Sequence, residues 1–180
     1  MMSKTSDISQ VIRKRRNKLA IKEGYINLLT KIILMMILGY FIFSQVFLLS
    51  RVEGNEMFPA AKDGDLIIGF RLQGYYEKND VITYRVSGER KVGRYMGQEG
   101  DIVTMDDSGT IRINGTVQSG EIMYPTYAKE GIKYPFQIPQ GYVFILGDYR
   151  TQTIDSRDFG PISKDNVEAK VITLLRRRGL

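Results

Sequence analysis

The side chains that could carry out chemistry in this chain are few in kind, because its 180 residues include no cysteine and no histidine. This composition excludes disulfides, thiol nucleophiles, imidazole bases and the usual zinc ligands. Any catalysis would therefore use Ser, Thr, Lys, Asp, Glu or Tyr. We expect neither a cofactor nor a metal site.

The segment VEGNEMFPAAKDGD, residues 52–65, carries the first candidate group, the carboxylate of Glu56. The segment has the composition of a loop, because Gly54 permits unusual backbone angles and Pro59 stiffens the exit toward the apolar residues that follow. Taken alone, such a loop between two elements requires no function. Its importance depends on the elements that position it.

An apolar run precedes this loop. Residues 32–49, IILMMILGYFIFSQVFLL, are 18 residues without a charge. As a helix they would reach about 27 Å, close to the thickness of about 30 Å of a bilayer's hydrocarbon core. A buried core helix would show a polar face, and a cleaved signal peptide would be shorter and followed by a small-x-small cleavage site. We therefore predict an uncleaved transmembrane anchor.

The net charge of +6 belongs to the N-terminal tail alone. Residues 1–31 hold eight Lys or Arg and two Asp or Glu, while the remainder holds 18 residues of each sign. A nucleic-acid-binding domain would carry its basic residues on the folded part, so nucleic acid is not an expected partner. The positive-inside rule predicts a cytoplasmic tail at 1–31 and an extracellular domain at 50–180. The chain would thus be a single-pass protein of the cell membrane.

The domain that follows the anchor is predicted to be a compact antiparallel β domain. Short apolar or β-branched runs alternate with turn residues, and a hairpin is clearest at residues 102–113, IVTMDDSGTIRI. The best candidate for a short helix is SKDNVEA, residues 163–169. The predicted strands are DLIIGF, DVITYRV, KVGRYM, DIVTM, TIRI, GYVFIL and AKVITLL.

Three boxes resemble those of type I signal peptidases in their short Gram-positive form. Residues 52–60, VEGNEMFPA, resemble V-x-G-x-S-M-x-P-T, and residues 93–101, GRYMGQEGD, resemble K-R-V-x-G-x-x-G-D. Residues 138–162, IPQGYVFILGDYRTQTIDSRDFGPI, resemble P-x-G-x-[YF]-[FV]-x-L-G-D-N-R-x-x-S-x-D-S-R-x-F-G. The boxes follow the family's order and spacing. The resemblance implies the mainly β, signal-peptidase-like fold, with one N-terminal transmembrane helix and a substrate bound as an extended strand.

The resemblance also implies a serine nucleophile and a lysine base, and both positions depart from the pattern. The serine position holds Glu56 and the lysine position holds Gly93, so we assign no catalytic residue and expect the chain not to be an enzyme. A carboxylate at position 56 would place negative charge where an oxyanion develops. Lys91 would share a strand face with Gly93, about 6.6 Å away, and would either pair with Glu56 or face water.

The other residues of the boxes form two predicted groups. The binding cleft is expected to be lined by residues of the loop and of one strand, namely Gly54, Asn55, Glu56, Met57, Phe58, Pro59, Lys91 and Tyr95. The retained residues of the third box combine paired charges with glycines at bends, which is typical of an architectural role. They are Gly147, Asp148, Arg150, Asp155, Ser156, Arg157, Phe159 and Gly160.

Signal-peptidase-like proteins without the dyad occur in some Gram-positive pilus gene clusters. The resemblance therefore implies a non-catalytic, membrane-anchored accessory or chaperone of pilus assembly. Its partner would be an exported protein, either a pilin subunit or a class C sortase. A cleft beside the membrane can accept an extended segment by strand addition.

Two alternatives stay open at this point. The chain could be an active type I signal peptidase, a serine endopeptidase with a relocated dyad that uses the hydroxyl of Ser50, Ser87 or Ser156. It could also be a membrane-tethered regulator of protein secretion.

Overall fold

The computed structural model describes residues 3–118 and 124–176, and the chain divides into two compact units, residues 1–44 and 45–180. The first unit consists of most of helix α1 (Ser3–Val46). Within this helix, residues 13–46 are long and apolar enough to cross a membrane, with a mean hydropathy of 2.1 over an 18-residue window. Such a helix agrees with the predicted anchor.

The helix ends earlier than the sequence suggests. The apolar run continues to Leu49, but α1 ends at Val46 and the next residues form strand β1 (Phe47–Arg51). The side chain of Leu48 is only 4% exposed and packs in the β unit. The prediction that residues 47–49 belong to the anchor is therefore wrong, because pairing with a neighbouring strand determines their backbone conformation.

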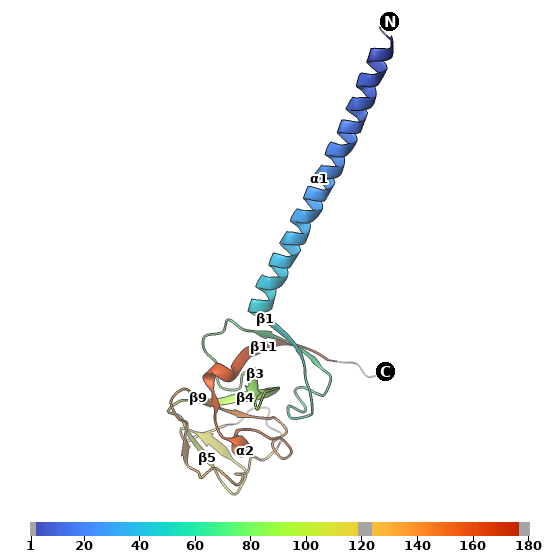
Figure 1. Ribbon diagram of the computed structural model, residues 1–180. Helices are drawn as coiled ribbons and strands as arrows, with labels where there is room; N and C mark the ends of the chain where they lie inside the picture. Colours follow the sequence, from blue (N-terminus) through green and yellow to red (C-terminus); the bar gives the residue numbers. More distant parts are fainter. Residues whose placement is uncertain (1–2, 119–123, 177–180) are drawn as a thin grey trace. The chain divides into compact units, whose positions relative to one another are not determined.

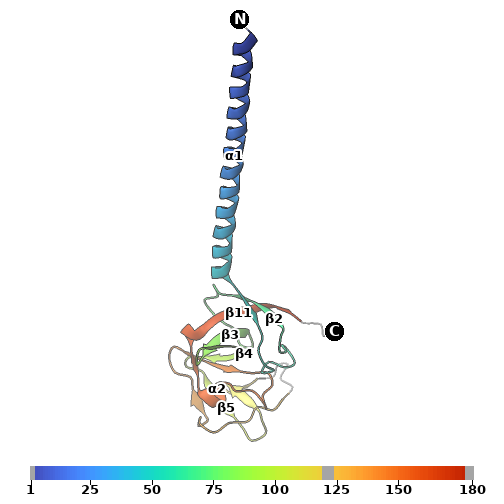
Figure 2. The same ribbon diagram turned by 45° about the vertical axis from the view of Figure 1, so that its right-hand side comes forward.

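The second unit is built on two antiparallel sheets among the residues that the structure describes (Figures 1 and 2). In sheet order, the larger one contains β1, β2 (Leu66–Phe70), β11 (Val167–Leu175), β3 (Val81–Val86), β4 (Glu89–Gln98), β9 (Tyr142–Leu146) and β10 (Ile162–Ser163). The smaller one contains β7 (Thr116–Val117), β6 (Ile111–Ile113), β5 (Ile102–Met105) and β8 (Phe136–Gln137). Both views place β11 at one end of this unit and β5 at the other. The predicted fold class, mainly antiparallel β with one long apolar N-terminal helix, is confirmed.

The local predictions have mixed outcomes. The hairpin at 102–113 is confirmed, with Val103 opposite Ile113 in the pairing of β5 and β6. The short helix predicted over 163–169 is wrong, because only η1 (Lys164–Asn166) is a 3-10 turn and β11 begins at Val167. Strand β11 lies between β2 and β3, so its backbone pairs with both neighbours and cannot remain helical.

The core consists of apolar side chains gathered on the two faces of the larger sheet. On one face, Met96 and Phe144 pack against Val103 and Ile113 of the smaller sheet. A second cluster contains Ile82, Tyr84, Tyr95, Val143, Ile145 and Ile162. A third surrounds Met57 of the 52–65 loop and includes Val52, Ala61, Ile67 and Val92. The loop that carries Glu56 is therefore part of the packed domain.

One carboxylate connects three neighbouring strands. Glu168 of β11 accepts hydrogen bonds from Arg85 of β3, at 2.6 Å, and from Arg90 of β4. The hydrogen bond from Arg90 is the main reason why the pKa of Glu168 falls to about 2, and Arg85 adds to the effect while partial burial opposes it. The unfolded chain would release this proton near pH 4.3, so ionised Glu168 favours the folded state above that pH.

We predict that part of the stability is lost as the pH falls from about 4.5 to about 2, because protonating Glu168 removes this contribution. The Glu168→Gln variant lacks it, so its urea midpoint should change less with pH than that of the wild type. The measurement is urea unfolding of the full chain in detergent, followed by circular dichroism. Replacing exposed Glu89 of β4 with Gln serves as the matched control. Equal pH dependence in Glu168→Gln and wild type would contradict the assignment.

Candidate functional site

The two charged residues singled out from the sequence lie against each other. Lys91 Nζ of β4 donates to Glu56 Oε1 at 2.8 Å, and the side chains are 20% and 23% exposed. The structure thus contains the predicted ion pair. The alternative prediction, that Lys91 faces water, is wrong. Because the pair is neither buried nor fully solvated, it remains accessible to a ligand from one side.

The backbone around Glu56 is fixed from within the loop. Val52 N donates to Asp65 O at 2.8 Å and Gly64 N donates to Val52 O at 2.9 Å, which closes the loop at its base. Gly54 N donates to the Asp63 carboxylate at 3.0 Å, which ties the two sides of the loop together. The loop therefore presents Glu56 from a defined backbone conformation.

The 147–153 segment holds the same loop from the other side. Tyr149 N donates to Glu56 O at 3.0 Å. Gly147 lies so close that a Cβ on it would be 2.7 Å from Glu56 O and 2.3 Å from the hydroxyl oxygen of Thr153. Only a glycine allows this approach, because any larger residue would push the loop away. This contact explains the requirement for glycine at position 147.

Position 93 has no room for a side chain. A Cβ on Gly93 would be 2.5 Å from Ile145 Cγ2 and 3.0 Å from Tyr84 Cε1. These two residues fill the space in which a lysine at this position would lie. Burial raises the pKa of Tyr84 well above its usual range, and the charges of Glu56 and Asp155 add to this, so its hydroxyl stays protonated.

The predicted cleft residues do not all come together. Gly54 and Asn55 are exposed, and Phe58 and Pro59 are half-buried next to Glu56. Met57 is 1% exposed and belongs to the core, so it is not available to a ligand. Tyr95 packs on Tyr76, with ring centroids 5.7 Å apart, in a different cluster. Tyr95 therefore does not line a cleft with Glu56.

An aromatic group beside Glu56 was not predicted as part of the site. Tyr149 lies between Phe58, at 5.9 Å between ring centroids, and Tyr124, at 4.8 Å. Lys62 Nζ lies 5.4 Å from the Phe58 ring centroid, a cation–π contact. The sequence signal for this group is Tyr149, which stands where the third box of the family pattern has asparagine.

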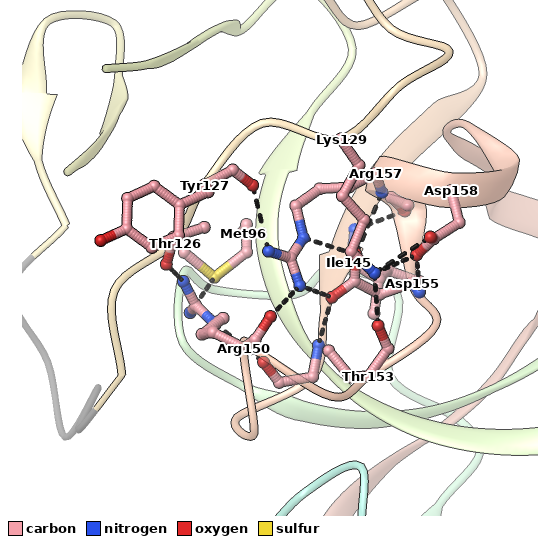
Figure 3. Close-up of polar contacts among 12 residues, drawn as sticks. Met96, Thr126, Tyr127, Lys129, Ile145, Arg150, Thr153, Asp155, Arg157 and Asp158 are labelled. Carbon is pink, nitrogen blue, oxygen red and sulfur yellow. Dashed lines mark hydrogen bonds and ion pairs between the residues drawn. The ribbon is translucent and has the colours of Figure 1, made fainter. Parts of the chain in front are cut away.

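The architectural residues of the third box form a buried polar network (Figure 3). Arg157 binds the Asp155 carboxylate through two hydrogen bonds of 2.9 Å, with both side chains almost fully buried. Asp155 also caps helix α2 (Ser156–Phe159) and accepts from Gly147 N at 3.2 Å. Ser156 Oγ accepts from the backbone N–H of Ile145 at 3.0 Å.

Two more members of the box are paired nearby. Asp148 receives two hydrogen bonds of 2.6 Å from Arg94 of β4. Arg150 is 1% exposed and donates to Gly147 O at 2.8 Å and to the Thr126 hydroxyl at 2.5 Å. Burial lowers the pKa of Arg150 to about 10. These contacts fit the architectural role expected from the sequence.

The hydroxyls considered for a relocated dyad differ in accessibility. Ser156 is fully buried, and its oxygen already accepts a backbone hydrogen bond. Ser87 is exposed in the turn between β3 and β4, with a positive φ of 52°. Ser50 is half-buried in β1, where its hydroxyl lies 3.5 Å from Arg51 O. Among the residues that the structure describes, none of the three hydroxyls is hydrogen-bonded to Lys91.

A model of the family described as signal peptidase, peptidase S26, matches residues 25–175. Signal peptidase IB of Staphylococcus aureus strain Mu50 is 30% identical over 169 residues, covering 83% of this chain and 86% of the relative. Thylakoidal processing peptidase 1 of Arabidopsis thaliana is 24% identical over 137 residues, and the match covers 67% of this chain but only 39% of that protein. A crystal structure of signal peptidase I from Enterococcus faecalis V583 has 27% identity and a TM-score of 0.47, covering 55% of this chain and 97% of the other.

These comparisons contradict one expectation. The chain was expected not to be an enzyme, yet the relatives that it resembles over most of its length are named as signal peptidases. That expectation depended on the residue types at two positions, 56 and 93, and it did not consider other groups at the site. The expectation that the chain is not an enzyme is therefore wrong.

We predict that Glu56 and Lys91 stabilise the fold jointly but modestly, because both are partly solvated. A double-mutant cycle of Glu56→Gln and Lys91→Met should give a coupling energy of about 0.5–1 kcal/mol. The measurement is urea unfolding of the full chain in detergent for the wild type, both single variants and the double variant. A coupling energy of zero would mean that the pair has no energetic importance in solution.

We also predict that Gly93→Ala destabilises the domain by about 1–3 kcal/mol, because its methyl group would collide with Ile145 and Tyr84. Ile145→Ala removes the closest contacting atom, so the double variant should be less destabilised than the sum of the single variants. Thermal unfolding of the three variants measures this. Additive effects would show that the two side chains do not compete for the same space.

Proposed function

Because the chain belongs to the signal peptidase family, peptidase S26, we propose that it binds an exported polypeptide as an extended strand beside Glu56 and Lys91. The observation that carries this proposal is the partly exposed ion pair between Glu56, at the serine position of the family pattern, and Lys91, two residues before its lysine position. An extended polypeptide offers alternating N–H and C=O groups along its edge. A carboxylate that accepts and an ammonium that donates are complementary to them.

The location that goes with this role is the outer face of a membrane. Helix α1 supports an anchoring role by its length and apolar composition, and the basic tail before it favours a cytoplasmic N-terminus. The β unit would then lie outside, where exported chains emerge. Helix α1 ends at Val46 and strand β1 begins at Phe47, so no linker separates them in the chain.

The aromatic group supplies apolar contact next to the charged pair. Phe58 follows Glu56 by two residues, and Tyr149 is fixed to the Glu56 backbone by a 3.0 Å hydrogen bond. Their rings are half-buried, so each retains surface for a ligand. A bound strand with an apolar side chain facing these rings would bury surface worth about 25 cal/mol per Å².

Peptide-bond hydrolysis is the second candidate, favoured by the names of the relatives and by the same pair. In this reaction Glu56 would accept a proton from water, whose oxygen attacks the peptide carbonyl carbon. The Lys91 ammonium would stabilise the resulting oxyanion, and Glu56 would return the proton to the departing amine as the C–N bond breaks. No serine is needed in this scheme, which fits the burial of Ser156.

The polypeptide partner is proposed to be a pilin subunit or a class C sortase. This choice is supported only by the likeness of the boxes to signal-peptidase-like proteins of pilus clusters. A preprotein of the general secretion route is the alternative partner. Both would present an extended exported segment, so the site geometry accommodates either one.

The binding proposal is tested by cross-linking. We expect benzoylphenylalanine in place of Phe58, in the full chain in detergent, to cross-link a purified pilin precursor on irradiation. The same group in place of exposed Tyr142 of β9 is the matched control and should give no adduct. Because hydrogen bonds to charged groups are worth about 1.5–3 kcal/mol, adding Glu56→Gln or Lys91→Met should weaken binding about tenfold or more. No adduct from position 58 with either a pilin precursor or a preprotein would overturn the proposal.

The same incubation without irradiation tests hydrolysis. A fragment released by the wild type and absent with Glu56→Gln would support Glu56 as the base. Release that continues unchanged in Glu56→Gln would contradict this scheme. In that case Ser50→Ala and Ser87→Ala would show whether a hydroxyl acts instead.

A further inference from the structure

A second cavity lies in the β unit, at the other end of the strand that carries Lys91. It has a volume of about 330 Å³ and is lined by Arg71, Tyr75, Tyr76, Tyr95, Gln98 and Lys164, among others. Two cationic side chains and three phenol groups thus surround one space. The volume is at the lower end of the range for small-ligand sites, about 300–1,000 Å³.

The guanidinium of Arg71 is incompletely satisfied in this cavity. Its Nε is buried and has no hydrogen-bond partner within residues 3–118 and 124–176. A buried N–H that is left unpaired destabilises the structure, and more so when it belongs to a charged group. Because this atom is closed to solvent, an anion in the cavity would supply the missing acceptor once the Arg71 side chain turns toward it. Arginine is also the side chain best suited to bind an anion through two parallel hydrogen bonds.

The other polar groups around the cavity favour an anion as well. Burial raises the pKa of Tyr95 to about 12 and, less strongly, that of Tyr76, so both hydroxyls remain donors. Lys164 is about half-exposed and pairs with Glu99 at 3.2 Å, a surface contact that an incoming anion can replace.

The neighbouring carboxylates do not cancel this charge. Asp80 forms an ion pair with Lys170, with 2.8 Å between Oδ1 and Nζ. Glu99 accepts from Gly141 N at 2.7 Å in addition to its contact with Lys164. Glu77 is exposed in the same loop region. Arg71 therefore faces the cavity with its positive charge uncompensated by any ion pair that the described residues show.

The cavity is close to the point where the chain would leave the bilayer. Arg71 N donates to the carbonyl of Val46, the last residue of α1, at 2.9 Å. Phe47 pairs with Phe70 in the adjoining strands. The next residues of this loop expose large apolar surface, with Leu72 64% and Tyr75 70% exposed. Tyrosine is typical of membrane–water interfaces, where its ring and hydroxyl meet different environments.

We propose that this cavity binds the phosphodiester group of a membrane phospholipid, with Arg71 and Lys164 as the cationic contacts. The site rests on the membrane anchoring given above, because Val46 places Arg71 near lipid headgroups. Leu72 and Tyr75 would lie toward the lipid, and the cavity would receive the phosphate. The bound lipid would fix the β unit against the bilayer independently of any polypeptide at Glu56.

The test uses the fact that the chain has no tryptophan. Tyr75→Trp in the full chain, in uncharged detergent micelles, places the chain's single tryptophan at the cavity, where it can be excited selectively over the tyrosines. Titration with phosphatidylglycerol should change its emission saturably. Adding Arg71→Gln should weaken this response at least tenfold, and Lys164→Gln should weaken it by a smaller factor. Arg112→Gln, which removes the same charge from a partly exposed pair with Asp106, is the control and should leave it unchanged.

The outcomes separate the sources of the phosphate. Glycerol 3-phosphate at equal concentration should have no effect if the lipid is the ligand, and an equal response would overturn the lipid assignment. A titration unchanged by both Arg71→Gln and Lys164→Gln would overturn the site itself. Thermal unfolding checks that Arg71→Gln folds, and Lys164→Gln alters only an exposed side chain. Because no polypeptide is present, these results do not depend on whether the site at Glu56 binds one.

Discussion

The buried ion pair of Arg157 and Asp155 determines the geometry of the Glu56 site. Asp155 accepts from Gly147 N, and Arg157 donates to the carbonyl of Arg150 at 2.6 Å, so the pair holds both ends of one tight segment. Gly147 within that segment lies against the Glu56 carbonyl, which Tyr149 N also contacts. A buried pair of this kind adds little net stability, but removing one partner is costly because it leaves an uncompensated charge. Its effect is to specify one backbone arrangement, which Glu56 shares.

The pair at the site itself is of a different kind. Glu56 and Lys91 remain about one-fifth exposed, so water screens their attraction and either side chain can exchange partners at little cost. A rigid network therefore supports a pair that can rearrange. This division suits a site that must bind a polypeptide, because the backbone is already ordered while the charged groups remain free to form new hydrogen bonds. The fold does not depend on the pair, whereas the proposed function does.

Much of the fold and part of the candidate site could be predicted from the sequence. The predictions that failed have a common cause. Alternating apolar residues and turn signals predicted the β domain, and the third box predicted its buried network, because both are local patterns. The end of α1 at Val46, the start of β11 at Val167 and the burial of Met57 depend on residues distant in sequence that pair or pack with these segments. Gly93 shows the same limit. From the sequence, Gly93 indicates only that the lysine of the family pattern is missing. The structure shows that Tyr84 and Ile145 fill the space that a side chain at this position would need.

One strand face relates the two proposed sites. Lys91, Gly93 and Tyr95 alternate along β4, so the ion pair and the headgroup cavity are about 13 Å apart along the strand. At Gly93 between them, Ile145 and Tyr84 pack directly against the backbone, which prevents a single continuous channel. Because a paired strand is stiff, a lipid held at the Tyr95 end would fix the height of Lys91 above the bilayer. An exported segment that is still attached to a membrane-embedded helix can likewise extend only a fixed distance from the bilayer. The spacing along β4 would therefore select which part of that segment meets Glu56.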